Sequence, residues 1–418
     1  MATLVVLCVA GCGAKTGLYF ADGGQQGETG PDEALDEAID VPIDMAPPPI
    51  PCIEVPRDVG PVDVPFALPV SLQVVDLFFL LDATASMIDE IETIRRRLRS
   101  EVVPGVVEAI PDAAFGVALV GEFPVEPHGP NDVLPYELRQ PITQDVLQVE
   151  GALERLPTWG NFDEPEAQVE GLFQVATGSG LPPWIPPSLG CPGGGSGGVC
   201  FRREALPVVL LITDAPMNNG PLGVRPESRY RFAGPSTYRS AVAQLMNRGV
   251  LVIGLGARDA FAQSPLSHLR AIARDTGAVA SDGSPLAFDI GSDGSGTGRG
   301  IVEAVSRLAA GTPLDVDAVV EDVPGDEFDA RELVQRVEAL RAEPSTGVRE
   351  QTPDAFLGTT PGTLVTFRLV LDPSAIPEQD ASIEIPGRVF FRANGSSRLE
   401  RREVLFLIPG NDGQRCEN

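Results

Sequence analysis

Oxygen-bearing side chains follow two strongly apolar segments of the sequence. In DLFFLLDATASM, residues 76–87, five apolar residues lead directly to Asp82, Thr84 and Ser86. In LPVVLLITDAP, residues 206–216, the apolar run ends in Thr-Asp at Asp214. Short, unbroken apolar runs are typical of strands buried on both faces of a sheet. Two carboxylates and two hydroxyls form an all-oxygen group that suits Mg²⁺ or Mn²⁺, with Ca²⁺ as a weaker candidate, and the lack of histidine and cysteine disfavours zinc.

Strand and helix patterns alternate around these two segments, from about residue 73 to residue 312. Strands are predicted near 72–82, 113–123, 206–214 and 249–256, and helices near 88–102, 146–156, 237–248, 265–275 and 298–310. The shorter strand predicted at 136–143 contains Pro141, which confines it to a sheet edge or a strand end. This alternation predicts an α/β fold with a doubly wound, mostly parallel sheet flanked by helices. Ligands bind beyond the carboxyl ends of such strands, so Asp82 and Asp214 are expected at one edge.

The motif Asp-x-Thr-x-Ser after a buried strand, followed by a strand that ends in Thr-Asp, resembles the von Willebrand factor type A (VWA) family. The resemblance covers about residues 73–312. It implies a metal-ion-dependent adhesion site (MIDAS), in which Thr84 and Ser86 bind the ion directly and Asp82 and Asp214 bind it largely through water. From the sequence alone, Ser86 is also a candidate N-cap for the helix that begins near Ile88.

The family supplies one more hydroxyl to its metal site, usually a threonine in a glycine-containing loop. The matching segment here, TWGNFDEPEAQVEGL at residues 158–172, resembles the G-G-G-D-x-P-E-A variant of extracellular and bacterial members. No threonine stands at the expected position, so Asp163 is the predicted substitute, with Glu164 or Thr158 as alternatives. In the family the ion keeps one position open for a carboxylate of the partner, which implies ligation rather than catalysis.

The composition excludes several classes of function. A net charge of −28 argues against nucleic acid as a partner, because little of the surface could neutralise phosphates. The single lysine, Lys15, leaves no P-loop lysine and no Schiff-base lysine in the folded part. The two histidines, His128 and His268, are expected in polar, loop-like surroundings, which leaves little for a catalytic triad or a histidine-based zinc site. The chain is therefore predicted not to be an enzyme.

The N-terminus reads as an export signal. In MATLVVLCVAGCGAK, an apolar stretch runs into Val9-Ala10-Gly11-Cys12, which resembles the lipobox of a bacterial lipoprotein. Residues 1–12 would then be the signal peptide, and Cys12 would carry the lipid, the only contact with the membrane. The alternatives are an apolar terminus without function and a Cys12 that forms a disulfide. The lipobox predicts a cell-envelope location, and in a cell with two membranes Gly13 favours the outer membrane.

Outside the signal peptide and the α/β segment, the sequence indicates a linker and a second domain, and its cysteines indicate two disulfides. Residues 13–72 are acidic and proline-rich, and they are expected to form a disordered linker. Cys191 and Cys200 flank a glycine-rich segment and are predicted to pair, so Cys52 and Cys416 pair by elimination. The alternative, a metal site of four cysteines, lacks any C-x-x-C spacing. Residues 313–418 predict a small antiparallel β domain, within which 330–341 could be helix or strand.

Three functions are compatible with these features. The first is an envelope lipoprotein that displays a metal-dependent module to bind a protein offering a carboxylate, or a polysaccharide. The second is a structural scaffold whose metal site is vestigial. The third is a divalent-metal hydrolase that uses Asp163, Glu164 and Glu166, and it is disfavoured because no pair of nucleophile and base is evident.

Overall fold

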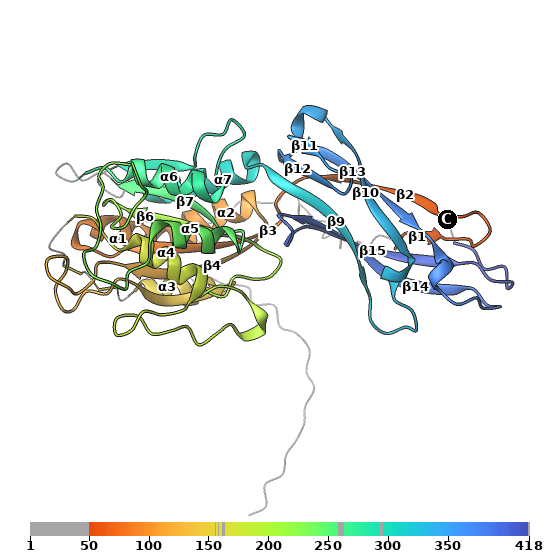
Figure 1. The fold of residues 1–418 in the computed structure, drawn as a ribbon, viewed down its shortest axis with the longest axis horizontal. Helices are drawn as coiled ribbons and strands as arrows, with labels where there is room; N and C mark the ends of the chain where they lie inside the picture. The colour runs from red at the N-terminus through yellow and green to blue at the C-terminus, as the bar shows by residue number, and fades with distance from the viewer. Residues whose placement is uncertain are drawn as a thin grey trace, which may run out of the picture. The chain divides into compact units, whose positions relative to one another are not determined.

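A six-stranded sheet with the order β5-β4-β3-β6-β7-β8 forms the centre of the α/β part (Figure 1). The computed structural model describes residues 50–154, 156–157, 159–160, 164–257, 263–291 and 296–416. The strands of this sheet are β3 (Val74–Asp82), β4 (Asp112–Val120), β5 (Glu137–Thr143), β6 (Leu206–Thr213), β7 (Leu251–Ala257) and β8 (Ala287–Gly291). Neighbouring strands are parallel except for β5, which pairs antiparallel with β4. β5 lies at the edge, where Pro141 is tolerated.

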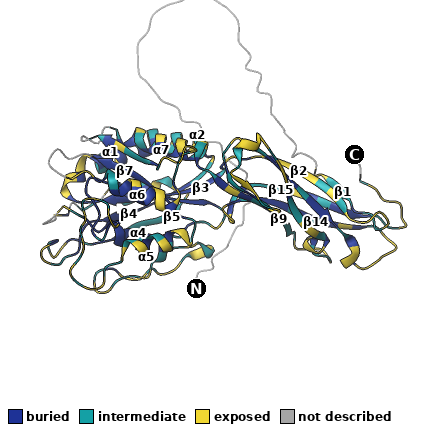
Figure 2. Cartoon of the chain, turned by 45° about the horizontal axis from the view of Figure 1, so that its top comes forward, coloured by how far each residue is buried: buried dark blue, intermediate teal, exposed yellow. Residues whose placement is uncertain are grey.

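Helices cover both faces of this sheet, which explains why β3 is buried along its whole length. Leu77, Phe79 and Leu81 belong to a core shared with α1, α2, α3 and α7, whereas Phe78 and Leu80 belong to a core with α4, α5 and α6. Successive strand residues point to opposite faces, so both sets must be apolar. Figure 2 shows exposed residues on the outer faces of the helices. The helices are α1 (Ile88–Arg97), α2 (Val103–Ala109), α3 (Val146–Leu153), α4 (Gln168–Thr177), α5 (Tyr238–Met246), α6 (Leu266–Thr276) and α7 (Thr297–Gly311).

A π-helical turn, Leu98–Val102, joins α1 to α2. Pro104 lies in the first turn of α2, where its missing N–H and its ring disturb the regular ladder of helical hydrogen bonds. The predicted helix therefore continues to Ala109 through a local change of pitch. None of the helices within the described residues combines the length and the apolar composition that a membrane crossing requires.

The remaining strands form two further sheets. One has the order β1-β15-β14-β9-β12-β11 and the other the order β10-β13-β2. The segment 330–341, open in the sequence, contains a short 3₁₀ helix, Ala330–Leu333, followed by strand β10. The strands are β1 (Cys52–Glu54), β2 (Val62–Pro69), β9 (Leu314–Asp322), β10 (Val334–Glu343), β11 (Glu350–Gln351), β12 (Ala355–Thr359), β13 (Leu364–Leu371), β14 (Ile383–Ala393) and β15 (Ser397–Ile408).

Strands β1 and β2 correct the predicted extent of the linker. β1 pairs with β15 and β2 pairs with β13, so residues 52–69 belong to the β sheets and are not a disordered linker. The prediction was wrong here because frequent proline and acidic residues conceal an alternation in which Phe66 and Leu68 are buried. Consequently the α/β part, residues 74–311, is inserted between β2 and β9. Residues 1–49, with the predicted signal peptide, Cys12 and most of the predicted linker, lie outside the described residues.

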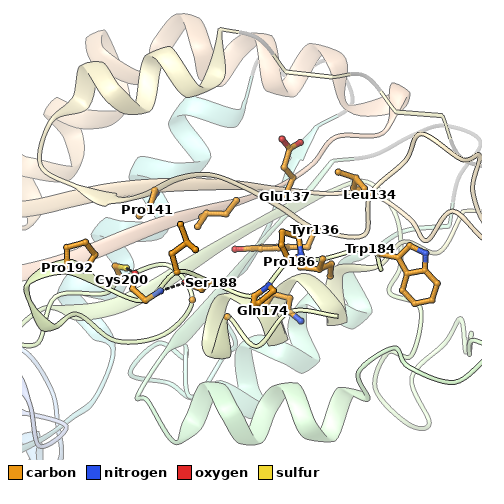
Figure 3. A pocket seen from close by; sticks show the side chains of 17 residues that line it. Leu134, Tyr136, Glu137, Pro141, Gln174, Trp184, Pro186, Ser188, Pro192 and Cys200 are labelled. Carbon is orange, nitrogen blue, oxygen red and sulfur yellow. Dashed lines mark hydrogen bonds between the residues drawn. The ribbon is translucent and has the colours of Figure 1, made fainter. Parts of the chain in front are cut away.

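Both predicted disulfides are confirmed. Cys52 bonds to Cys416 with a Cα–Cα distance of 5.5 Å, and this bond fastens β1 to the C-terminal segment. Cys191 bonds to Cys200 with a Cα–Cα distance of 5.2 Å and closes the glycine-rich loop. That loop lies beside an apolar pocket (Figure 3).

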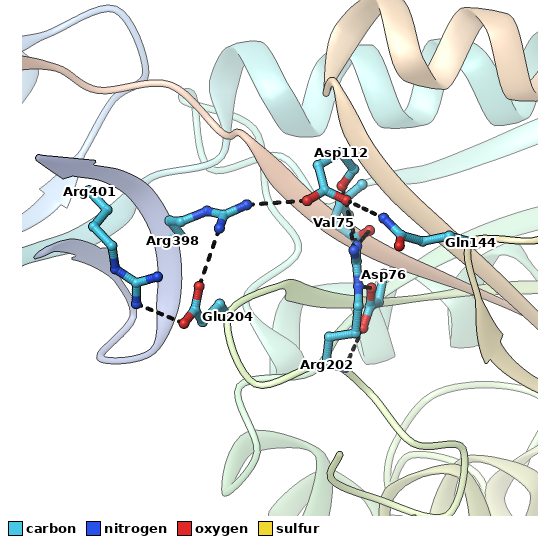
Figure 4. A network of polar contacts seen from close by, with 8 residues as sticks. All are labelled: Val75, Asp76, Asp112, Gln144, Arg202, Glu204, Arg398 and Arg401. Atoms are coloured by element: carbon cyan, nitrogen blue, oxygen red, sulfur yellow. Dashed lines mark hydrogen bonds and ion pairs between the residues drawn. The ribbon is translucent and has the colours of Figure 1, made fainter. Parts of the chain in front are cut away.

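A polar network connects the loop before β6 to the first residues of β3 and β4 and to β15 (Figure 4). Arg202 donates from its backbone nitrogen and from Nε to the Asp76 carboxylate at 2.5 and 2.6 Å, and from Nη1 to Asp112 at 2.7 Å. Arg398 of β15 reaches Asp112 at 3.2 Å and Glu204 at 3.4 Å. Asp76 is wholly buried, and burial raises its pKa to about 6 although Arg202 acts to lower that pKa.

Candidate functional site

The ends of β3 and β6 lie side by side at the carboxyl edge of the sheet. Leu81 pairs with Ile212, so the next residues, Asp82 and Thr213, stand together. Thr213 Oγ1 donates a hydrogen bond of 2.6 Å to Asp82 Oδ2. Asp214 follows directly, with 5% of its surface exposed, and its charge acts on Asp82. The structure therefore brings the two predicted carboxylates to one edge.

The loop after β3 folds back onto the Asp82 carboxylate. Asp82 Oδ1 accepts hydrogen bonds from Thr84 N at 3.0 Å and from Thr84 Oγ1 at 2.7 Å. Ser86 Oγ lies 3.3 Å from Thr84 Oγ1 and is exposed, whereas Asp82 and Thr84 are buried. Ser86 does not cap the following helix, because α1 has Met87 at its N-cap position and no side-chain cap. The predicted residues Asp82, Thr84 and Ser86 thus form one run of oxygen atoms that leads from the interior to solvent.

The segment after α3 is bound to this loop by two backbone hydrogen bonds. Trp159 N donates to Ala83 O at 2.9 Å, and Ala85 N donates to Trp159 O at 3.1 Å. These bonds place the start of the TWGNFDEPEA segment next to Thr84. Asp163 and Thr158, the predicted substitute for the family's loop threonine and one alternative to it, lie outside the described residues.

The remaining predicted carboxylates, Glu164 and Glu166, differ in their surroundings. Glu164 is exposed and accepts a hydrogen bond from Gln263 N at 3.3 Å. Glu166 is wholly buried, and its backbone N–H donates to Pro216 O. Because one is exposed and the other is enclosed by protein, the structure does not present them as a matched pair of hydrolytic carboxylates.

Burial and the neighbouring charge act together on Asp82. The side chain is wholly buried, and its pKa is raised to about 7, first by burial and then by the Asp214 carboxylate. Hydrogen bonds from Thr213 and Thr84 oppose this rise in pKa. Two neighbouring carboxylates with little access to water repel each other, and a cation between them would relieve that repulsion.

Gln168, which sequence reasoning did not assign to the site, fixes the position of Thr213. It is the first residue of α4 and is wholly buried. Its Nε2 donates to Thr213 Oγ1 at 2.9 Å and to Ala215 O at 3.2 Å. Thr213 in turn donates to Asp82, so Gln168 acts on the carboxylate through Thr213. Its only sequence signal is its place directly after the DEPEA run.

A second buried carboxylate, Glu122, joins the loops that surround the strand ends. It follows β4 closely and accepts hydrogen bonds from Asn218 Nδ2 at 2.6 Å, from Tyr230 Oη at 2.5 Å and from Phe123 N at 2.6 Å. Burial and the Glu122 charge raise the pKa of Tyr230 well above its usual value. The Phe123 ring also packs at about right angles to the rings of Tyr230 and Trp184. This cluster joins the segment after β4 to the segment after β6, and the sequence pattern did not predict it.

The prediction of polar, loop-like surroundings holds in part for His128 and fails for His268. His128 lies in a turn, but it is 7% exposed and packs against the rings of Tyr230 and Phe232, and His268 is 1% exposed. His268 belongs to α6, its Nδ1 accepts a hydrogen bond from Met217 N at 3.0 Å, and burial lowers its pKa. The prediction was wrong because a helix turns His268 toward the interior, where a neutral ring serves as an acceptor.

The donors at the strand ends fit a hard cation, provided that hydroxyls take part. Among the described residues, no three His, Cys, Asp or Glu side chains gather into a group that could hold a metal. Asp82 and Asp214 alone would be too few ligands, so Thr84 and Ser86 are needed. The resulting set contains only oxygen, as Mg²⁺ and Mn²⁺ prefer.

Comparisons with known proteins give distant likenesses of structure. No family model matches the sequence, and no curated protein does. The structure is similar to a von Willebrand factor type A protein from Catenulispora acidiphila, with a TM-score of 0.38 and 13% identity over 86% of this chain and 72% of that one. It is also similar to proximal thread matrix protein 1 of the mussel byssus, with a TM-score of 0.34 and 14% identity over 59% of this chain and 48% of that one. The strand-end geometry therefore has to carry the functional inference.

Proposed function

We propose that this protein is a VWA-like binding module that holds its partner through a divalent cation at the ends of β3 and β6. The observation that carries the proposal is the buried Asp82 carboxylate, which lies beside Asp214 and is bonded to Thr84 and Thr213. Two adjacent carboxylates, one of them wholly buried, repel each other, and a bound cation would offset that repulsion. The doubly wound, mostly parallel arrangement predicted from the sequence is part of this proposal.

In the proposed site Thr84 and Ser86 bind the ion directly, and Asp82 and Asp214 bind it largely through water. Asp163 is the proposed fifth contributor. Mg²⁺ or Mn²⁺ is the proposed ion, before Ca²⁺, because the ligand oxygens are few and leave room for water. Exposure of Ser86 supports access for a partner, whose carboxylate would take the remaining position on the ion.

The proposed partner is a protein that offers a carboxylate, or a polysaccharide, and the proposed role is binding rather than catalysis. The proposed location is the cell envelope, with lipid on Cys12 as the only membrane anchor and the outer membrane as the destination in a cell with two membranes. The net charge of −28 supports a partner other than nucleic acid.

The test is calorimetric titration of Mg²⁺ and Mn²⁺ into the EDTA-stripped protein. We expect saturable binding in the parent protein and none in Asp82→Asn, which removes one charge from the site with little change of shape. Asp76→Asn is the matched control, because it makes the same change in the same strand at the opposite end, and it should bind the ion normally. Absence of binding heat in a folded parent protein would contradict the proposal.

A scaffold with a vestigial metal site is the alternative, and it predicts a different result for a captured partner. If the cation mediates binding, Thr84→Ala and EDTA should each abolish retention of the partner. Retention that is unchanged by both treatments would favour the scaffold.

A further inference from the structure

A pocket of about 540 Å³ lies beside the edge strand β5 (Figure 3). Its walls come from the start of β5, from α4, from residues 184–190 and from the loop that the Cys191–Cys200 bond closes. This volume is within the range of roughly 300–1,000 Å³ that is usual for small-molecule sites. None of the residues proposed to bind the cation lines it.

The lining of the pocket is almost entirely apolar and uncharged. Leu138, Trp184 and four prolines belong to the wall, and Glu137 is the one charged residue among the 17 that line it. Glu137 already pairs with Arg139 at 2.7 Å. An anion would therefore meet a like charge, and a cation would find no uncompensated partner, so a neutral ligand fits best.

One polar group in the pocket has no partner. Tyr136 is 7% exposed, and its hydroxyl makes no hydrogen bond to any of the residues that the structure describes. Figure 3 shows its ring in the middle of the pocket. Burial raises the pKa of Tyr136, so the hydroxyl stays protonated and can both donate and accept. The Oη atom itself has almost no accessible surface, so a ligand in the pocket would meet the ring of Tyr136 and not its hydroxyl.

The walls around Tyr136 are fixed before any ligand arrives. Gln174 is already occupied, since its Nε2 donates to Glu170 at 2.7 Å and its Oε1 accepts from Gly180 N at 2.9 Å. A Cβ at Gly198 would lie 2.2 Å from Gln174 O, so the disulfide loop packs tightly against α4. A preformed wall lowers the conformational cost of binding.

We propose that this pocket binds a neutral small molecule that is mostly aromatic or aliphatic. The apolar wall, which includes the ring of Tyr136, supplies the affinity. The site is independent of the cation at the strand ends.

The experiment uses N-phenyl-1-naphthylamine, a neutral aromatic amine whose fluorescence increases in apolar surroundings, with the full chain. We expect saturable binding of one probe molecule per chain, with energy transfer from Trp184, and no effect of EDTA. The transfer should persist in Trp159→Phe, which leaves Trp184 as the remaining tryptophan. Absence of saturable binding, or loss of transfer in Trp159→Phe, would overturn the proposal.

Two exposed leucines provide a matched pair that does not disturb the core. Leu189 lines the pocket and Leu222 does not, and their exposed fractions are 105% and 85%. We expect Leu189→Asp to weaken probe binding at least several-fold and Leu222→Asp to leave it unchanged. The reverse result would place the probe elsewhere on the surface and would refute this site.

Discussion

Asp82 is placed where its charge is difficult to accommodate. It accepts hydrogen bonds from Thr84 and Thr213, yet burial and the Asp214 carboxylate still raise its pKa to about 7. An ionised group under such conditions lowers the free energy of unfolding. Natural proteins keep groups of this kind where function needs them. The residue therefore destabilises the protein in the absence of a cation.

The first prediction concerns stability without metal. In EDTA at pH 8, Asp82→Asn should raise the free energy of unfolding by about 1–3 kcal/mol, because the relief of a buried charge exceeds the loss of an acceptor. Urea unfolding followed by circular dichroism measures this difference. Saturating Mg²⁺ should stabilise the parent and not the variant, since only the parent binds it. A less stable variant in EDTA would refute this account of Asp82.

Among the site residues, those close together in the sequence could be predicted as a group, and most contacts between residues far apart in the sequence could not. Asp82, Thr84 and Ser86 stand within five residues, so their grouping follows from the strand that precedes them. Gln168 reaches Thr213 across 45 residues, and Glu122 reaches Asn218 across 96. The packing of the folded chain selects such partners, and the pattern of a single sequence does not show which residues will meet.

Among the elements, β3 carries polar groups at both ends of an otherwise apolar strand. Asp82 stands at its carboxyl end, and Asp76, near its start, accepts two hydrogen bonds from Arg202. Arg202 also donates to Val75 O at 3.0 Å and to Asp112. The loop that leads into β6 therefore binds the start of β3. The carboxyl end of β3 is bound to Thr213 through Asp82.

The second prediction concerns pH. The folded pKa of Asp76 is about 6, above its ordinary value of 3.8, so the folded state holds this proton more tightly than the unfolded state does. The contribution of Asp76 to stability is thus complete below about pH 4 and is lost as pH rises through 6, by up to about 3 kcal/mol. Unfolding free energies measured from pH 4 to 7 should fall less steeply in Asp76→Asn than in the parent. Parallel curves would contradict the assigned pKa.

Helices and strands were predictable where the polarity of their residues matches their burial in the fold. β3 and β6 are buried on both faces and are continuously apolar, and Pro141 marks an edge strand. α4 was missed because its polar residues Gln168, Glu170 and Gln174 are buried with the apolar ones, so its sequence does not mark which face points to the core. β1 and β2 were missed because proline and acidic residues, typical of linkers, also suit edge strands.

At the scale of the whole molecule, one chain segment is inserted within another. The β sheets use residues 52–69 together with 314–408, and the α/β part occupies the interval between them. Arg398 and Arg401 of β15 bind Glu204 of the inserted part at 3.4 and 2.8 Å. The Cys52–Cys416 bond closes the outer segment on itself.

The third prediction compares the two disulfides. The Cys52–Cys416 bond spans 364 residues and the Cys191–Cys200 bond spans 9. Cross-links over longer loops restrict the unfolded chain more, so replacing Cys52 and Cys416 with serine should cost about 3–5 kcal/mol of unfolding free energy. Replacing Cys191 and Cys200 should cost about 1–3 kcal/mol. Urea unfolding of both double variants measures these two losses of unfolding free energy. A larger loss for the Cys191–Cys200 variant would refute the prediction.

The insertion also separates β2 from its partner along the chain. β2 precedes β13, the strand with which it pairs, by about 300 residues. The α/β part can form its own sheet before β2 and β13 meet, and Phe66 and Leu68 stay exposed until then. β2 contains Pro65 and Pro69, which cannot donate to a neighbouring strand. Pro65 and Pro69 therefore reduce the ability of β2 to pair with strands of other chains before β13 is in place.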